Sequence, residues 1–93
     1  MKKSKTGFLK NGDLVYLQWE DSQGCPRGWE DPSAARGAEP TGIESIGWVS
    51  AVSKRAVQIA PHVAHHQGAL NCIQGHITIP RSAILKIQRI KVK

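Results

Sequence analysis

The sequence predicts an all-β fold, a small, five-stranded, strongly bent antiparallel barrel with a long loop after its first strand. Nine Gly and five Pro, together with many Val and Ile, favour short strands and turns over long helices. Several short runs alternate apolar and polar side chains, which is the period of a strand. Because 93 residues leave no room for a second core, we expect residues 1–93 to form a single domain.

The first strand is predicted at Leu14 to Trp19. It follows a basic lead-in, residues 1–10, and the turn signal Asn11-Gly12-Asp13. Its side chains alternate between two faces, of which we expect one to be buried and the other to be partly covered. Val15, Leu17 and Trp19 share one face, and Leu14, Tyr16 and Gln18 share the other.

Residues 20–44 are predicted to form a long acidic loop or insertion. They contain three Pro, four Gly and six of the seven acidic residues, with no apolar periodicity. Trp29 is expected to anchor this loop against the core. A short helical turn is expected within it, with Asp31 as the N-cap and Pro32 at the first position.

The next pair of runs predicts an antiparallel hairpin. Its arms are residues 46–52 and 56–62, and its tip is Ser53-Lys54-Arg55. We expect Pro61 to end the second arm, since proline cannot donate to a ladder. The side chains expected to point inward are Val49 and Ala51 on the first arm and Val57 and Ile59 on the second. Those expected to project from the opposite face are Trp48 and Val52.

The last part of the chain predicts two more strands after a polar connection, residues 64–74. The fourth strand is residues 75–80, with Ile77 and Ile79 on one face. The triplet Arg81-Ser82-Ala83 then turns the chain, and Pro80 marks a corner of the barrel.

The fifth strand, residues 84–92, has apolar side chains on both faces. Leu85 and Ile87 share one face, whereas Ile90 and Val92 fall on the other. Either a bulge shifts the phase of the strand or both faces are covered. The second alternative requires a partner chain or a wrapped loop.

The net charge of +6 is distributed unevenly. All seven acids lie between residues 13 and 44, while residues 45–93 contain seven basic residues and no acid. This pattern favours a basic surface for polyanions, a basic face that meets the acidic segment of a neighbouring copy, or simply a solvated surface.

The candidate nucleic-acid-binding residues are Lys54 and Arg55 at the hairpin tip and Arg81 in the final turn. In a barrel of this order both turns are expected near one rim, where they would form a compact phosphate-binding patch. Four aromatic residues are either stacking surfaces for bases or anchors of the core and loop. They are Tyr16, Trp19, Trp29 and Trp48.

Five potential metal ligands lie within fifteen residues: His62, His65, His66, Cys72 and His76. His62 with His65 or His66 has a plausible ligand spacing, but no second pair of this kind accompanies it. We therefore interpret the five residues as incidental members of a polar loop and expect no metal or other cofactor. Cys72 and a histidine lack a third group to orient them as a catalytic pair. We therefore expect no enzyme activity and no small-molecule substrate. Cys25 and Cys72 are expected to stay reduced.

No run approaches the roughly 20 apolar residues that cross a bilayer. The beginning, "MKKSKTGFLK", lacks an apolar centre and a small-residue cleavage site, so it does not resemble a signal peptide. We expect a cytoplasmic protein with no membrane partner. A barrel with open edges and a two-faced last strand also predicts a homo-oligomer.

Two stretches resemble a known family. The hairpin "GWVSAVSKRAVQIA" and the closing "IPRSAILKI" are similar to the Sm-like barrel, a small five-stranded barrel that is also Src-homology-3-like. This resemblance implies assembly through the fourth and fifth strands and, as in many members, RNA binding. The segments "GDLVYLQWEDS", "IGWV", "IAPH" and "TIPRSAI" further resemble small bacteriophage and prophage proteins, which implies a phage or prophage origin.

Overall fold

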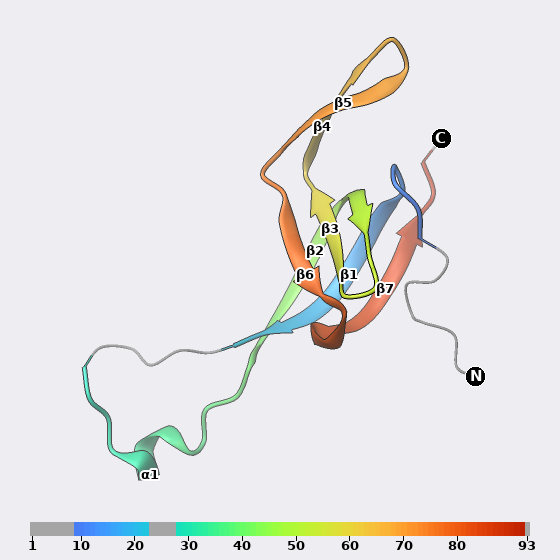
Figure 1. Ribbon diagram of the computed structural model, residues 1–93. Coiled ribbons are helices and arrows are strands. Elements are labelled where there is room, and N and C mark those ends of the chain that lie inside the picture. The colour runs from blue at the N-terminus through green and yellow to red at the C-terminus, as the bar shows by residue number, and fades with distance from the viewer. Residues whose placement is uncertain (1–8, 23–27, 93) are drawn as a thin grey trace.

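The computed structural model describes residues 9–22 and 28–92, and most of its regular elements are antiparallel strands (Figure 1). A five-stranded sheet has the order β6-β3-β2-β1-β7, and β4 and β5 form a separate two-stranded sheet. The all-β prediction is confirmed. The sheet strands are β1 (Leu14–Asp21), β2 (Thr41–Val52), β3 (Ala56–Ala60), β6 (Ile77–Pro80) and β7 (Ile84–Ile90). The remaining elements are β4 (His62–His66), β5 (Ala69–Gln74), α1 (Pro32–Ala35) and the 3₁₀ turn η1 (Arg81–Ala83).

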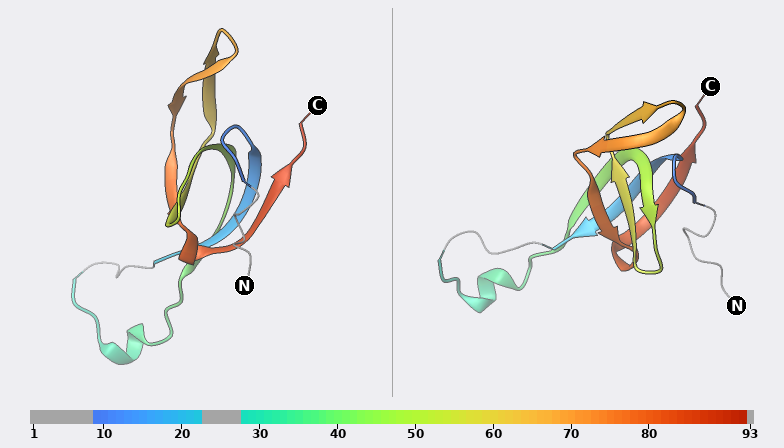
Figure 2. Two further views of the ribbon diagram at one scale, coloured as in Figure 1. Left: turned by 45° about the vertical axis from the view of Figure 1, so that its right-hand side comes forward. Right: turned by 45° about the horizontal axis from the view of Figure 1, so that its top comes forward.

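The sheet folds over on itself because β2 pairs with two different strands along its length. Its first part pairs with β1 and its last part with β3, so Trp48 lies opposite both Leu14 and Ala60. Strands β3 and β6 consequently face β1 and β7 across the core (Figure 2).

The predicted barrel is not closed. Strands β6 and β7 are the two edges of the described sheet, and η1 separates them in the chain. Pro80 ends β6 and has no N–H to donate, and the 3₁₀ turn that follows redirects the chain before β7 begins. The expected corner at Pro80 is therefore present, but a β6–β7 ladder is not.

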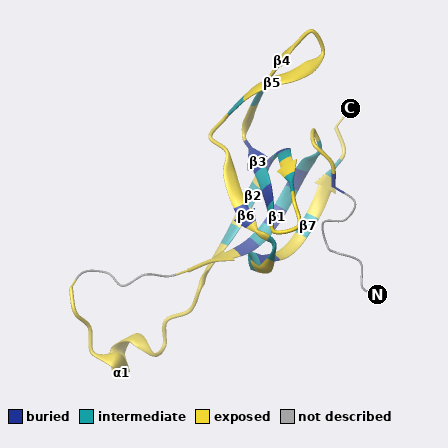
Figure 3. Ribbon diagram, in the orientation of Figure 1, coloured by how far each residue is buried: buried dark blue, intermediate teal, exposed yellow. Residues whose placement is uncertain are grey.

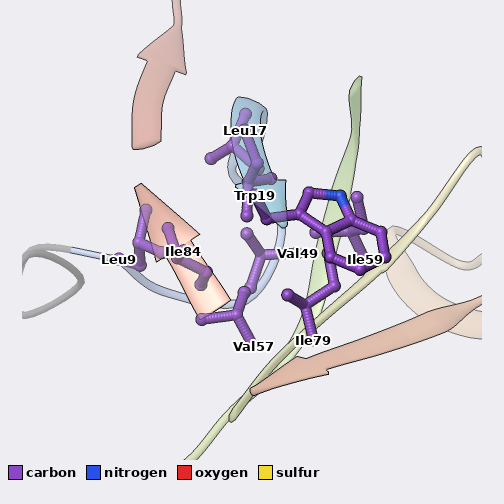
Figure 4. Packing of buried hydrophobic residues seen from close by; sticks show 9 residues of the cluster. Leu9, Leu17, Trp19, Val49, Val57, Ile59, Ile79 and Ile84 are labelled. Carbon is purple, nitrogen blue, oxygen red and sulfur yellow. The ribbon is translucent and has the colours of Figure 1, made fainter. Parts of the chain in front are cut away.

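The core lies inside the fold of the sheet (Figure 4). Val15, Leu17 and Trp19 are all buried, which confirms that the first strand has one buried face. Residues from β2, β3, β6 and β7 meet them from the other strands. These residues are Val49, Val57, Ile59, Ala60, Ile79 and Ile84, and Leu9 packs beside them from the segment before β1.

A bulge in β2 corrects one predicted face. The register passes from Val49 opposite Ile59 to Ala51 opposite Gln58, so Ser50 is an extra residue. The shift turns Ala51 outward and packs Val52 against the core. The predictions for Ala51 and Val52 were therefore wrong, whereas Val57 and Ile59 point inward as expected.

A second bulge lies near the start of the last strand. Ile84 lies opposite Trp19 and Lys86 opposite Gln18, which leaves Leu85 as the extra residue. Ile84 is buried and Ile87 packs against the core, but Leu85 is 53% exposed. The expected pairing of Leu85 with Ile87 on one face was wrong. A bulge is therefore present, and Ile90 lies opposite Leu14 on the outer face, where it is half-buried.

The polar connection is itself a hairpin, contrary to the loop predicted for residues 64–74. Strand β3 ends at Ala60, two residues earlier than predicted, and Pro61 separates it from β4. The two turn residues between β4 and β5, Gln67 and Gly68, have φ angles of 54° and 80°. Positive φ at both positions is typical of a type I′ turn, which matches the twist of a hairpin. The chain then returns to β6, where Ile79 is fully buried and Ile77 is 40% exposed.

The long loop is shorter than predicted because β1 and β2 pair up to Asp21 opposite Thr41. This extended ladder carries the following segment away from the core (Figure 1). We call residues 28–40 the arm. The short helix is confirmed, with the Asp31 carboxylate accepting the Ser33 N–H at 2.9 Å. Trp29 is fully exposed at 103%, so the prediction that it anchors the loop was wrong.

No helix among the described residues has the length and apolar character needed to span a membrane.

Candidate nucleic-acid interface

The two basic turns meet at one edge of the folded sheet. The backbone N–H of Arg81 in η1 donates to the carbonyl of Arg55 at the β2–β3 tip, with an N···O distance of 2.9 Å. Ala56 and Pro80 lie opposite each other beside this bond, so β3 and β6 hold the two turns in place. We call Lys54, Arg55 and Arg81 the basic rim.

The β2–β3 tip is ordered by its own hydrogen bonds. The hydroxyl of Ser53 accepts the N–H groups of Arg55 at 3.2 Å and Ala56 at 3.1 Å. The N–H of Ser53 donates to the carbonyl of Ala56 at 3.0 Å. Serine commonly closes a turn in this way. Because the backbone is held, the side chains of Lys54 and Arg55 are presented from a fixed base.

Two of the three cationic side chains of the rim face solvent. Lys54 and Arg55 are exposed, and Arg81 is half-buried. Within the described part of the chain, the ion pair closer than 4 Å joins Arg89 to Asp13 at 3.6 Å, which leaves Lys54 and Arg55 without a carboxylate partner. Exposed cationic side chains without a carboxylate partner can bind phosphate oxygens.

The aromatic residues fall into different environments. Trp19 is 7% exposed and its indole N–H donates to the Ser45 hydroxyl at 3.1 Å, so it is a core residue and offers no stacking face. The Tyr16 hydroxyl donates to Glu44 at 2.6 Å. This hydrogen bond to a carboxylate is the main reason why the pKa of Tyr16 is raised. Trp29 and Trp48 remain accessible, fully and partly respectively.

Trp48 lines a cleft that the sequence did not predict. The cleft encloses about 270 Å³ between the β4–β5 hairpin and the turn before β1. Hydrogen bonds from Gly12 N–H to Val49 C=O, 2.8 Å, and from Val49 N–H to Asp13 C=O, 2.7 Å, hold that turn against β2. We call this the Trp48 cleft; it is lined by Asn11, Gly12, Trp48, Val49, Val63, His65, Gly68 and Leu70.

A second, shallower groove adjoins the Trp48 cleft. Trp48 and Gly12 line both depressions, so the two lie side by side. This groove has a volume of about 450 Å³ and lies beside the end of β7. Three cationic side chains, Lys10, Arg89 and Lys91, contribute to its lining. We call it the basic groove.

The histidines and Cys72 do not form a metal centre in the described part of the chain, where no three His, Cys, Asp or Glu side chains gather closely enough. Cys72 is exposed and free, opposite Ala64 in the β4–β5 ladder. His65 lines the Trp48 cleft. Cys25 lies outside the described residues.

Comparisons with protein-family models, curated proteins and solved structures found no match to this chain.

Proposed function

We propose that this chain is a non-enzymatic protein that binds RNA or DNA in the bacterial cytoplasm, using the basic rim to hold phosphates. We also propose that it is an Sm-like or Src-homology-3-like small barrel of phage or prophage origin. The sheet order and the β6–η1–β7 corner support this kinship. One observation carries the functional proposal: the hydrogen bond from Arg81 to Arg55, which joins two basic turns that lie far apart in the sequence.

Binding at the rim is electrostatic. Phosphate groups displace condensed counterions when Lys and Arg neutralise them, so affinity falls as the salt concentration rises. If the three cations of the rim each contact one phosphate of a single strand, the logarithm of affinity falls against the logarithm of salt with a slope of about −2. The net charge of +6 adds a longer-range attraction that speeds encounter.

In the described part of the chain, no accessible aromatic side chain belongs to the rim. Trp19, on the strand that pairs with the start of β7, is buried in the core. Contacts to phosphates position a nucleic acid but carry little sequence information, and base contacts supply specificity. We therefore expect the protein to bind single strands of different sequence with similar affinity.

The experiment is a titration of labelled single-stranded RNA and DNA by fluorescence anisotropy at two salt concentrations. We expect binding at low salt that weakens at high salt, and a loss of roughly tenfold or more in Lys54→Glu plus Arg55→Glu. The control is Lys10→Glu plus Lys91→Glu, which makes the same change in net charge beside the basic groove. Equal losses in the two variants would show that net charge, not the rim, is responsible. No binding at low salt would refute the proposal.

A second candidate function is that of a protein-interaction module with no nucleic-acid role. The observation in its favour is the pair of accessible tryptophans, Trp29 on the arm and Trp48 in its cleft. Tryptophan is enriched where proteins bind one another. In that case the wild-type protein would assemble but fail to bind either nucleic acid at low salt.

A further inference from the structure

Among the described residues, the most exposed aromatic side chain lies on the arm, which projects from the sheet. Trp29 is 103% exposed and stands two residues before Asp31, the N-cap of α1. A tryptophan buries 150–250 Å² when it is covered, so leaving its whole ring in water forgoes a large hydrophobic gain. No residue of the arm is buried (Figure 3). The arm therefore carries an apolar group that contributes nothing to the core of its own chain.

The Trp48 cleft has the complementary chemistry. Apolar side chains of Trp48, Val63 and Leu70 line it, and Leu70 is 43% exposed. Its volume of about 270 Å³ is of the size that an aromatic side chain can enter. Aromatic pairs prefer offset-stacked or edge-to-face contact, and Trp48 offers a partly exposed ring for it.

The charges around the two features are also complementary. The arm contains Glu30, Asp31 and Glu39 but a single basic residue, Arg36. Asp31 accepts hydrogen bonds from the N–H and hydroxyl of Ser33, which lower its pKa and keep it ionised. The basic groove beside the Trp48 cleft presents Lys10 and Lys91. An arm seated with Trp29 in the cleft would thus bring its acids toward these lysines.

The arm lies far from the cleft of its own chain. The arm leaves the sheet at the Asp21–Thr41 end of the β1–β2 ladder, whereas the cleft lies at the Leu14–Trp48 end. The eight residues of β1 separate these ends by roughly 25 Å. The arm also points away from the sheet, on the side opposite the β4–β5 hairpin (Figures 1 and 2).

We propose that the Trp48 cleft binds the arm of a second copy of this chain, with Trp29 inserted between Trp48, Val63 and Leu70. The contact is head-to-tail, because each copy offers an arm at one end and a cleft at the other. Such interfaces close into a ring or extend into a filament, depending on the rotation between neighbours. The interface goes beyond the proposed nucleic-acid binding and does not depend on it.

The test is a complementation experiment by sedimentation velocity, without nucleic acid. Trp29→Ala removes the arm's anchor but leaves the cleft intact, and Leu70→Asp spoils the cleft but leaves the arm intact. We expect the wild-type protein to assemble and each variant alone to associate at least about thirtyfold more weakly, as for a central interface residue. An equimolar mixture of the two variants contains one functional arm and one functional cleft, so it forms a dimer and nothing larger.

The control is Leu85→Asp, which changes a leucine of similar exposure at the other end of β1 and is expected to assemble like the wild type. A charge exchange provides a second test: Glu30→Lys weakens assembly, and mixing it with Lys91→Glu restores it. A monomeric wild-type protein at several hundred micromolar would overturn the proposal. So would a mixture that stays monomeric, or a cleft that takes up a single-stranded oligonucleotide in place of the arm. None of these results bears on binding at the rim, which the anisotropy titration measures.

Discussion

The folded sheet and the two segments that project from it use their apolar residues in opposite ways. The sheet holds every buried hydrophobic residue in the described part of the chain except Leu9. The arm and the β4–β5 hairpin hold none, yet they carry Trp29 and Leu70 on their surfaces (Figure 3). The sheet therefore supplies the stability of the fold. The projections contribute little to it, and their exposed apolar groups are available to other molecules.

The largest effect expected from this contrast is on a central core residue. Leu17 is fully buried in β1, so Leu17→Ala should lower the free energy of unfolding by about 2–5 kcal/mol through lost burial and a cavity. The matched control is Leu85→Ala, a leucine 53% exposed on the β7 bulge, which should cost less than about 1 kcal/mol. Urea unfolding of both variants measures the difference. Similar losses would contradict the assignment of the core.

A smaller effect is expected in the β4–β5 hairpin. Gly68 has a φ of 80°, which an L side chain rarely adopts, so Gly68→Ala should destabilise the hairpin by about 1 kcal/mol. Gly37 in the arm has no positive φ and nothing within 4 Å of an added Cβ, so Gly37→Ala should be neutral or slightly stabilising. Amide hydrogen exchange of β4 and β5 reports the change locally. Unaltered protection in Gly68→Ala would argue against the type I′ turn.

The smallest effect concerns the arm and depends on pH. Hydrogen bonds from Ser33 lower the pKa of Asp31 in the folded arm. The cap on α1 is therefore fully present above the ordinary pKa of an aspartate and is lost as the pH falls through the lowered value. The amide signal of Ser33 should shift over that acidic range, while the melting temperature of the sheet changes little in Asp31→Ala. A pH-independent Ser33 signal would show that the cap does not form.

Some of this architecture is readable from the sequence and some is not, for physical reasons. The alternation in residues 14–19 predicted a strand with one buried face, because side chains of that face are buried along β1 up to Trp19. Asp31 followed by Pro32 predicted the capped helix, because capping depends only on neighbouring residues. The side chains that face the core after Ser50 and beside Leu85 were predicted wrongly, since a bulge adds a residue to a strand without a distinctive side chain to mark it.

The candidate sites were likewise predicted only in part from the sequence. Both basic turns were predicted, and the hydrogen bond between Arg55 and Arg81 brings them together as expected from a barrel-like order of strands. The Trp48 cleft was missed because it is made by three segments far apart in sequence, one of them a hairpin whose polar residues resemble a loop. The predicted outward position of Trp48 was the one sequence feature that pointed to an accessible apolar surface there. Trp29 was misplaced because a lone aromatic residue usually packs on its own chain.

The most direct test asks whether nucleic acid binds at the basic rim and leaves the Trp48 cleft, at the other end of β1, free for the arm. Trp29→Ala has an intact rim and an intact Trp48 cleft, so its ¹H–¹⁵N spectrum can be titrated with a single-stranded oligonucleotide. We expect the backbone amides of Lys54, Arg55 and Arg81 to shift, while the indole N–H signals of Trp19 and Trp48 stay in place. A moving Trp48 indole with unmoved rim amides would contradict this account, because nucleic acid would then occupy the cleft assigned to the arm.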